Sequence, residues 1–84
     1  MVVSAISCPV YETSEVEGEL SLVRSREVLA EIVERRNAEG EPIRYLDGRL
    51  LLGPDETDDL PDGVHPTPEA YARIARRFVA LGGV

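Results

Sequence analysis

Hydrophobic and polar positions divide the chain into short apolar runs and two longer amphipathic stretches. Residues 2–6 are apolar and rich in β-branched side chains, and a proline follows soon afterwards, so this run predicts a short buried strand. Residues 7–20 contain a row of glutamates and a glycine and predict a loop. Residues 43–46 precede the turn signal Asp47-Gly48 and predict a second strand.

Two stretches repeat their apolar positions with helical spacing. The longer one, residues 22–38, follows a serine that can cap a helix start, and Gly40 lies just beyond its end. The second begins after Thr67, a favourable N-cap, carries Pro68 in its first turn and stops at two glycines. The apolar stripes consist of Leu22, Val28, Leu29, Ile32 and Val33 in the first helix and of Tyr71, Ile74, Ala75, Phe78 and Val79 in the second.

The order of these elements predicts an α/β fold. A leucine run at residues 50–52 fits either a strand or a turn of helix, and residues 54–66, rich in Asp and Pro, predict a loop. One strand–helix–strand unit implies two parallel strands with a right-handed crossover. Two strands do not make an independent sheet, and so apolar a strand needs cover on both faces. We therefore expect residues 1–84 to be one part of a three-layer α/β/α sandwich, with helices flanking parallel strands.

The charge of the chain narrows the classes of partner. Its formal net charge is −7, so the phosphate groups of nucleic acids and of anionic membranes would repel it. No apolar run approaches the roughly 20 residues of a membrane helix, and we expect no membrane insertion. The N-terminus lacks the basic region of a signal peptide, which predicts a cytoplasmic chain unless an upstream segment directs it elsewhere.

All nine basic residues are arginines. Those on the two predicted helices stand among acidic neighbours, and we expect them on solvated faces. They are Arg24, Arg26, Arg35, Arg36, Arg73, Arg76 and Arg77.

The single cysteine excludes an intrachain disulfide. Cys8 lies between a predicted strand and a proline, where a packed thiol is the expected role. A nucleophilic Cys8 paired with His65 is the alternative. The serines are expected to be strand, loop and cap residues, because none stands in a tight strand-to-helix turn. They are Ser4, Ser7, Ser14, Ser21 and Ser25.

Residues 62–66, Asp-Gly-Val-His-Pro, carry the candidate chemistry. Gly63 allows a tight turn, so the Asp62 carboxylate can reach one ring nitrogen of His65 and leave the other free to take a proton from a nucleophile. Pro66 restricts the histidine backbone to an extended conformation. An Asp-x-x-His pattern by itself is a weak signal, because a lone histidine in a small domain is usually a surface or cap residue.

The same stretch, followed by Thr-Pro-Glu-Ala-Tyr and a terminal amphipathic helix, resembles the last signature block of the SGNH (GDSL-type) hydrolases. Residues 3–12 look like the family's fourth strand and its loop, and residues 45–52 look like its fifth strand and exit. The resemblance implies a flavodoxin-like sandwich and an acyl-ester hydrolase of the serine esterase or lipase type. It assigns catalytic roles to His65, as general base and then acid, and to Asp62, as its orienting carboxylate, with a small-molecule ester as substrate and no cofactor.

The sequence departs from the family in lacking its other blocks. It has no Gly-Asp-Ser block to supply the nucleophile, and its only asparagine, Asn37, stands at a predicted helix end. We therefore expect the C-terminal portion of such a domain, without its serine-bearing half and inactive alone. A non-catalytic interaction module, or half of a two-chain assembly that pairs through an exposed sheet edge, is the alternative.

The acidic loop admits one further interpretation, a calcium site. Its spacing does not match an EF-hand loop, and no glycine stands where that turn needs one, so a solvated loop is expected. The acidic residues concerned are Asp55, Glu56, Asp58, Asp59 and Asp62.

Overall fold

The computed structural model describes residues 1–14 and 20–83. Its elements in chain order are β1 (Val2–Val3), α1 (Pro9–Glu12), α2 (Leu22–Ala38), β2 (Tyr45–Leu46), the 3-10 helices η1 (Gly48–Leu50) and η2 (Pro54–Asp59), and α3 (Pro68–Ala80).

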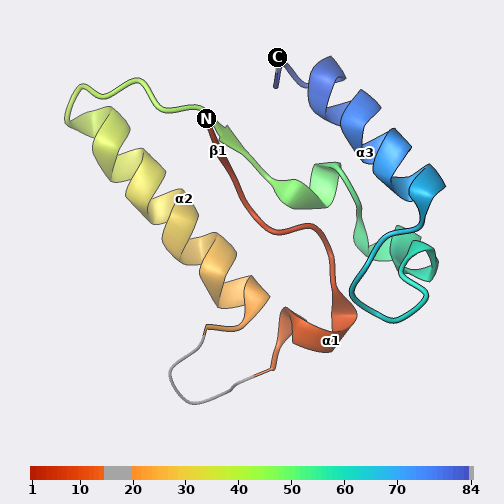
Figure 1. Cartoon of the computed structure of the whole chain (residues 1–84). Coiled ribbons are helices and arrows are strands. Elements are labelled where there is room, and N and C mark those ends of the chain that lie inside the picture. The colour runs from red at the N-terminus through yellow and green to blue at the C-terminus, as the bar shows by residue number, and fades with distance from the viewer. Residues whose placement is uncertain (15–19, 84) are drawn as a thin grey trace.

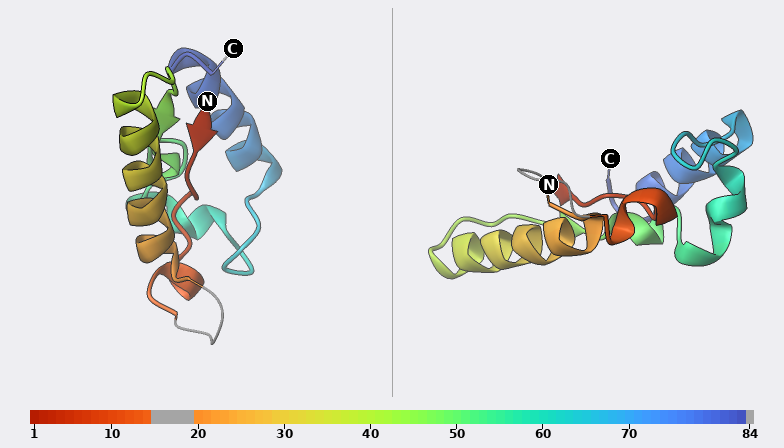
Figure 2. Two further views of the ribbon diagram at one scale, coloured as in Figure 1. Left: turned by 90° about the vertical axis from the view of Figure 1, so that its left-hand side faces the viewer. Right: turned by 90° about the horizontal axis from the view of Figure 1, so that it is seen from below.

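The two strands pair in parallel, as expected for a strand–helix–strand unit. The Val2 N–H donates to the Arg44 carbonyl at 2.8 Å, and the Ser4 N–H donates to the Leu46 carbonyl at 3.0 Å. Helix α2 lies on one side of the strand pair and α3 on the other (Figures 1 and 2). The body is a thin slab of 41 × 36 × 17 Å. Two strands are too few to establish the three-layer sandwich, which stays a prediction.

Both long helices begin where the sequence predicts. The Ser21 hydroxyl accepts the Arg24 N–H at 3.2 Å, and the Thr67 hydroxyl accepts the Ala70 N–H at 3.1 Å, so each satisfies a backbone donor that the first turn leaves unpaired. Helix α2 ends at Ala38, and two residues later the chain turns at Gly40, whose φ of 96° suits a residue without a Cβ.

The strands and loops are less regular than predicted. The predicted strands at residues 2–6 and 43–46 each have only two residues in the ladder. The predicted loop at residues 7–20 contains α1, and its residues 15–19 lie outside the described part of the chain. The predicted loop at residues 54–66 contains η2.

A close backbone approach follows the ends of both strands, β1 at Val3 and β2, as predicted, at Leu46. A Cβ on Gly48 would lie 2.1 Å from the Ser4 carbonyl oxygen, so only glycine lets the chain turn against β1 at this point. The Gly48 N–H donates to the Ser4 hydroxyl at 2.9 Å instead of continuing the ladder. The 3-10 helix η1 includes only Leu50 of the leucine run, and Leu51 and Leu52, which follow it, are buried.

The helix stripes are only partly covered. Val33 and Ala70 are buried, but Ile32 on α2 is 43% exposed, and Tyr71 and Val79 on α3 are 54% and 57% exposed. Part of each stripe is therefore left exposed by the described chain. None of the helices in the described residues is both long enough and apolar enough to cross a membrane.

Candidate functional site

The loop from Leu60 to Thr67 is fixed at both ends. Leu60 is buried, its carbonyl accepts the Gly63 N–H at 2.9 Å, and the Thr67 N–H donates to the Asp59 carbonyl at 2.9 Å. The Cys8 thiol, just before α1, donates to the Gly63 carbonyl at 3.0 Å. Strands β1 and β2 are parallel, so their carboxyl ends lie at the same edge of the sheet. The loop lies beyond that edge, beside α1 (Figure 1). That is the edge where α/β folds place their ligand sites.

Asp62 and His65 meet within this loop. The Asp62 Oδ2 atom lies 2.5 Å from the His65 Nδ1 atom. The other carboxylate oxygen, Oδ1, accepts the backbone N–H of His65 at 2.6 Å and that of Val64 at 2.9 Å. The turn that brings them together depends on Gly63, whose φ is 82°. One carboxylate therefore both caps the turn and orients the ring.

The hydrogen bonds determine the charge of Asp62 and the tautomer that a neutral His65 ring would adopt. The His65 backbone N–H, followed by its ring and by the Val64 N–H, holds the pKa of Asp62 well below its usual range. An ionised carboxylate only accepts hydrogen bonds, so the proton between the two groups belongs on Nδ1 of His65. In a neutral imidazole with its proton on Nδ1, the Nε2 atom carries the lone pair, and the His65 side chain is 74% exposed. The pair can accept a proton from a neighbouring hydroxyl group.

The Cys8 alternative gains no support from this geometry. Cys8 is buried at 6% exposure, and its thiol donates to a backbone carbonyl instead of pairing with His65. The packed thiol that the sequence predicts is observed.

The acidic loop is less solvated than expected. Glu56 accepts two hydrogen bonds from Arg77, at 2.6 and 2.8 Å, and Asp59 pairs with Arg73. These ion pairs attach η2 to α3, which fixes the segment on either side of the Asp62–His65 loop. Within residues 1–14 and 20–83, no group of three or more His, Cys, Asp or Glu side chains has the geometry to hold a metal ion.

The expectation that Arg26 is solvated is wrong. Its side chain is 6% exposed and donates to the Ala5 and Ile6 carbonyls at 3.1 and 2.9 Å. It also makes a bidentate ion pair with Glu12 at 2.5 and 3.0 Å, which lowers the pKa of that carboxyl. Glu12 in turn accepts the Cys8 N–H at 2.8 Å. This cluster holds the carboxyl end of β1 and supports α1 beside the candidate site.

Arg26 could have been found from the sequence by its position on the helix. It stands four residues after Leu22 and seven before Val33, so it shares the inward face with them. Asn37 also has a structural role, because its side-chain amide exchanges two hydrogen bonds with the Ile43 backbone, at 2.7 and 3.0 Å.

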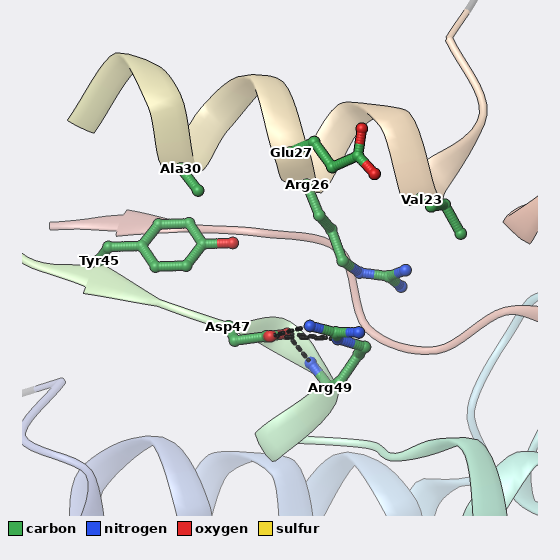
Figure 3. A pocket seen from close by; sticks show the side chains of 7 residues that line it. All are labelled: Val23, Arg26, Glu27, Ala30, Tyr45, Asp47 and Arg49. Atoms are coloured by element: carbon green, nitrogen blue, oxygen red, sulfur yellow. Dashed lines mark hydrogen bonds and ion pairs between the residues drawn. The ribbon is translucent and has the colours of Figure 1, made fainter. Parts of the chain in front are cut away.

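Two hollows lie along the side of the slab that carries β2 and η1. The first, of about 300 Å³, contains the Asp47–Arg49 ion pair and is shown in Figure 3. The second, of about 400 Å³, lies between α1 and η2, and Arg49 lines both. Neither is lined by Asp62 or His65. The Asp62–His65 pair thus lies outside both hollows.

Comparisons with known proteins leave the chain without an assigned family, because no protein-family model, curated protein or solved structure matches it.

Glu56 should make the fold sensitive to acid. The pKa of Glu56 is about 2 in the folded chain, mainly because Arg77 donates to it, against an ordinary value of 4.5. The pKa of Glu56 is lower in the folded chain than in the unfolded chain. The ionised carboxylate therefore stabilises the fold fully at a pH above the ordinary pKa, and this stabilisation is lost as the pH falls toward the folded-state pKa. We expect Glu56→Gln to remove this part of the pH dependence of the free energy of unfolding, measured by urea denaturation.

The control for this measurement is Asp58→Asn, a change at an exposed neighbour that makes no ion pair with another described residue. Between about pH 5 and pH 2, the free energy of unfolding of Asp58→Asn should change with pH as steeply as that of the wild type. Equal slopes for Glu56→Gln and the wild type would contradict the role given to the Arg77 pair.

Proposed function

We propose that this chain is the C-terminal portion of an SGNH-type serine ester hydrolase, in which Asp62 and His65 form the acid–base half of the catalytic triad. One observation carries the proposal: a single carboxylate accepts two backbone N–H groups of its own turn and also the Nδ1 side of the His65 ring. A histidine that served only as a surface residue would not need its tautomer fixed in this way.

The reaction assigns one step to each group. His65 Nε2 takes the proton of a serine hydroxyl as the serine oxygen attacks the ester carbonyl, and returns it to the departing alcohol. Water then attacks the acyl-serine with His65 again as base. Asp62 stabilises the imidazolium that forms in each step, without itself taking the proton.

The nucleophile and the oxyanion-hole donors belong to polypeptide outside these 84 residues. Ser4 and Ser7 are buried, and the Ser4 hydroxyl is engaged by Gly48. Asn37 is engaged at the end of α2, which takes it away from the role of oxyanion donor. We place the reaction in the cytoplasm and take small, soluble esters as substrates.

The experiment that tests this function is a fusion. A segment of an SGNH-type hydrolase that carries the Gly-Asp-Ser block and the two middle blocks is joined upstream of Met1, and hydrolysis of p-nitrophenyl acetate and butyrate is followed. We expect turnover by the fusion and none by the 84 residues alone. The His65→Ala fusion should lose about a thousandfold or more in kcat.

The matched control is the Asp58→Asn fusion, which changes an exposed charge near the site loop and should turn over normally. A fusion that unfolds cooperatively but shows no turnover would count against the proposed function. So would turnover that survives His65→Ala unchanged.

A non-catalytic interaction module is the second candidate, favoured by the apolar side chains that both long helices leave exposed. The His65→Ala variant distinguishes the two functions. An interaction module would bind its partner as well as the wild type does, and neither protein would catalyse ester hydrolysis.

A further inference from the structure

We infer that Cys8 is a positioning residue for the candidate proton-transfer pair, which it holds in place through the peptide group that follows Gly63. The carbonyl of this peptide group accepts the Cys8 thiol at 3.0 Å. Its N–H, which belongs to Val64, donates to the Asp62 carboxylate at 2.9 Å. That the resulting geometry serves ester hydrolysis rests on the proposed function, whereas the positioning rests on contacts within the chain.

The orientation of this peptide group is not fixed by its own residue. Gly63 has no Cβ, and its φ of 82° lies in a region that glycine enters without steric cost. The peptide group that follows a glycine can therefore rotate more freely than one that follows another residue. The Cys8 thiol selects the orientation in which the carbonyl faces the start of α1 and the N–H faces Asp62.

The Asp62 carboxylate depends on this orientation. Its Oδ1 atom accepts the Val64 N–H and, at 2.6 Å, the His65 N–H, while its Oδ2 atom lies 2.5 Å from the ring nitrogen Nδ1. Without the Val64 bond the carboxylate could rotate about its Cβ–Cγ bond, and Oδ2 would be held less firmly against the ring. A donor on the carbonyl also polarises the peptide group and strengthens the bond that its N–H makes.

Cys8 is itself held firmly. Its N–H donates to the Glu12 carboxylate at 2.8 Å, and its carbonyl accepts the Tyr11 N–H at 3.0 Å. Glu12 is bound in turn by the buried Arg26. Cys8 is also buried, which keeps water from competing for its thiol. The donor that reaches the turn is therefore aimed by α1 and, behind it, by α2.

A second contact joins α1 to the same glycine. A Cβ on Gly63 would lie 2.9 Å from the Cγ2 atom of Val10, so the two segments are in van der Waals contact at this point. Val10 belongs to α1, and Cys8 is the residue that precedes the first turn of this helix. The helix therefore meets the turn at one polar and one apolar point, beside the candidate site (Figure 1).

The test uses NMR spectroscopy of the 84-residue chain and needs no ester hydrolysis. In the wild type, the nitrogen chemical shifts of a neutral His65 ring should place the proton on Nδ1, and the Val64 amide should exchange slowly although its bond is exposed. Cys8→Ala should mix the two ring tautomers. It should also speed exchange at Val64 about fivefold relative to Ser4, whose N–H belongs to the pairing of β1 with β2.

The conservative variant Cys8→Ser keeps a donor at the same position, so it should restore both the slow exchange of Val64 and the single tautomer of His65. The matched control is Ser7→Ala, which changes the adjacent side chain. Ser7 is as buried as Cys8 but lines the second hollow, so this variant should behave as the wild type does.

Three results would overturn the inference: fast exchange of Val64 in the wild type, equal effects of Cys8→Ala and Cys8→Ser, or equal effects of Cys8→Ala and Ser7→Ala. The first needs no variant, so it holds even if Cys8→Ala fails to fold. In the fused hydrolase, Cys8→Ala should lower kcat about fivefold and leave KM unchanged. A folded fusion without turnover would count against the proposed function and would leave the NMR results as they stand.

Discussion

Asp62→Asn is expected to lower kcat of the fused hydrolase about ten-thousandfold at neutral pH. Asparagine can still accept the Val64 and His65 backbone N–H groups through its oxygen, so the turn keeps its shape. Its NH₂ group then takes the place of Oδ2 and donates to Nδ1 of His65. The ring proton moves to Nε2, where a lone pair is needed to accept the proton of the serine.

A second variant separates this tautomer effect from loss of the turn. Asp62→Ala removes both the turn cap and the ring partner, so it should lower thermal stability as well as kcat, whereas Asp62→Asn should lower kcat alone. The measurements are steady-state kinetics with p-nitrophenyl butyrate and thermal unfolding followed by circular dichroism. An Asp62→Asn enzyme within tenfold of the wild-type rate would show that Asp62 serves the turn and not the reaction.

Arg26→Ala is expected to cost about 3 kcal/mol of the free energy of unfolding. The change leaves the Ala5 and Ile6 carbonyls and the Glu12 carboxylate without their shared donor. A domain of this size has only a few kcal/mol of stability to lose, so the variant should be largely unfolded at room temperature. Urea denaturation followed by circular dichroism measures the difference.

Arg24→Ala is the control from the same helix. Its ion pair with Glu27 is more than half exposed at both ends, and such pairs contribute about 0.5 kcal/mol or less. Similar losses for Arg24→Ala and Arg26→Ala would mean that the Arg26 cluster does not hold the end of β1.

Local chemistry explains what the sequence predicts well. Helices α2 and α3 follow from caps and stop signals that act within one turn, and the contacts of Ser21 and Thr67 are those expected. The Asp62–His65 contact was equally predictable, because both residues belong to one turn built around Gly63. Whether that contact is catalytic stays a prediction.

The misses share a different cause, which is contact between distant segments. Strand β1 stops earlier than predicted because the carbonyls of Ala5 and Ile6 bind Arg26 on α2, and no pattern within residues 2–6 announces that contact. Helix α1 has only four residues, too few for a periodicity, and is held by Glu12 and Arg26. The apolar stripes identify the helices correctly but cannot tell which of their members this chain covers.

Arg26 also imposes an order on the assembly of the molecule. The carbonyl of Ala5 accepts a hydrogen bond from Arg26, which lies 21 positions later in the chain. The segment that follows β1 therefore cannot reach its final position until the ribosome has synthesised the start of α2. Pairing with β2 becomes possible only after that. The thiol of Cys8 finds its acceptor, the carbonyl of Gly63, 55 positions later in the chain than Cys8 itself. We therefore expect the turn that bears His65 to become ordered last during synthesis, on a framework already in place.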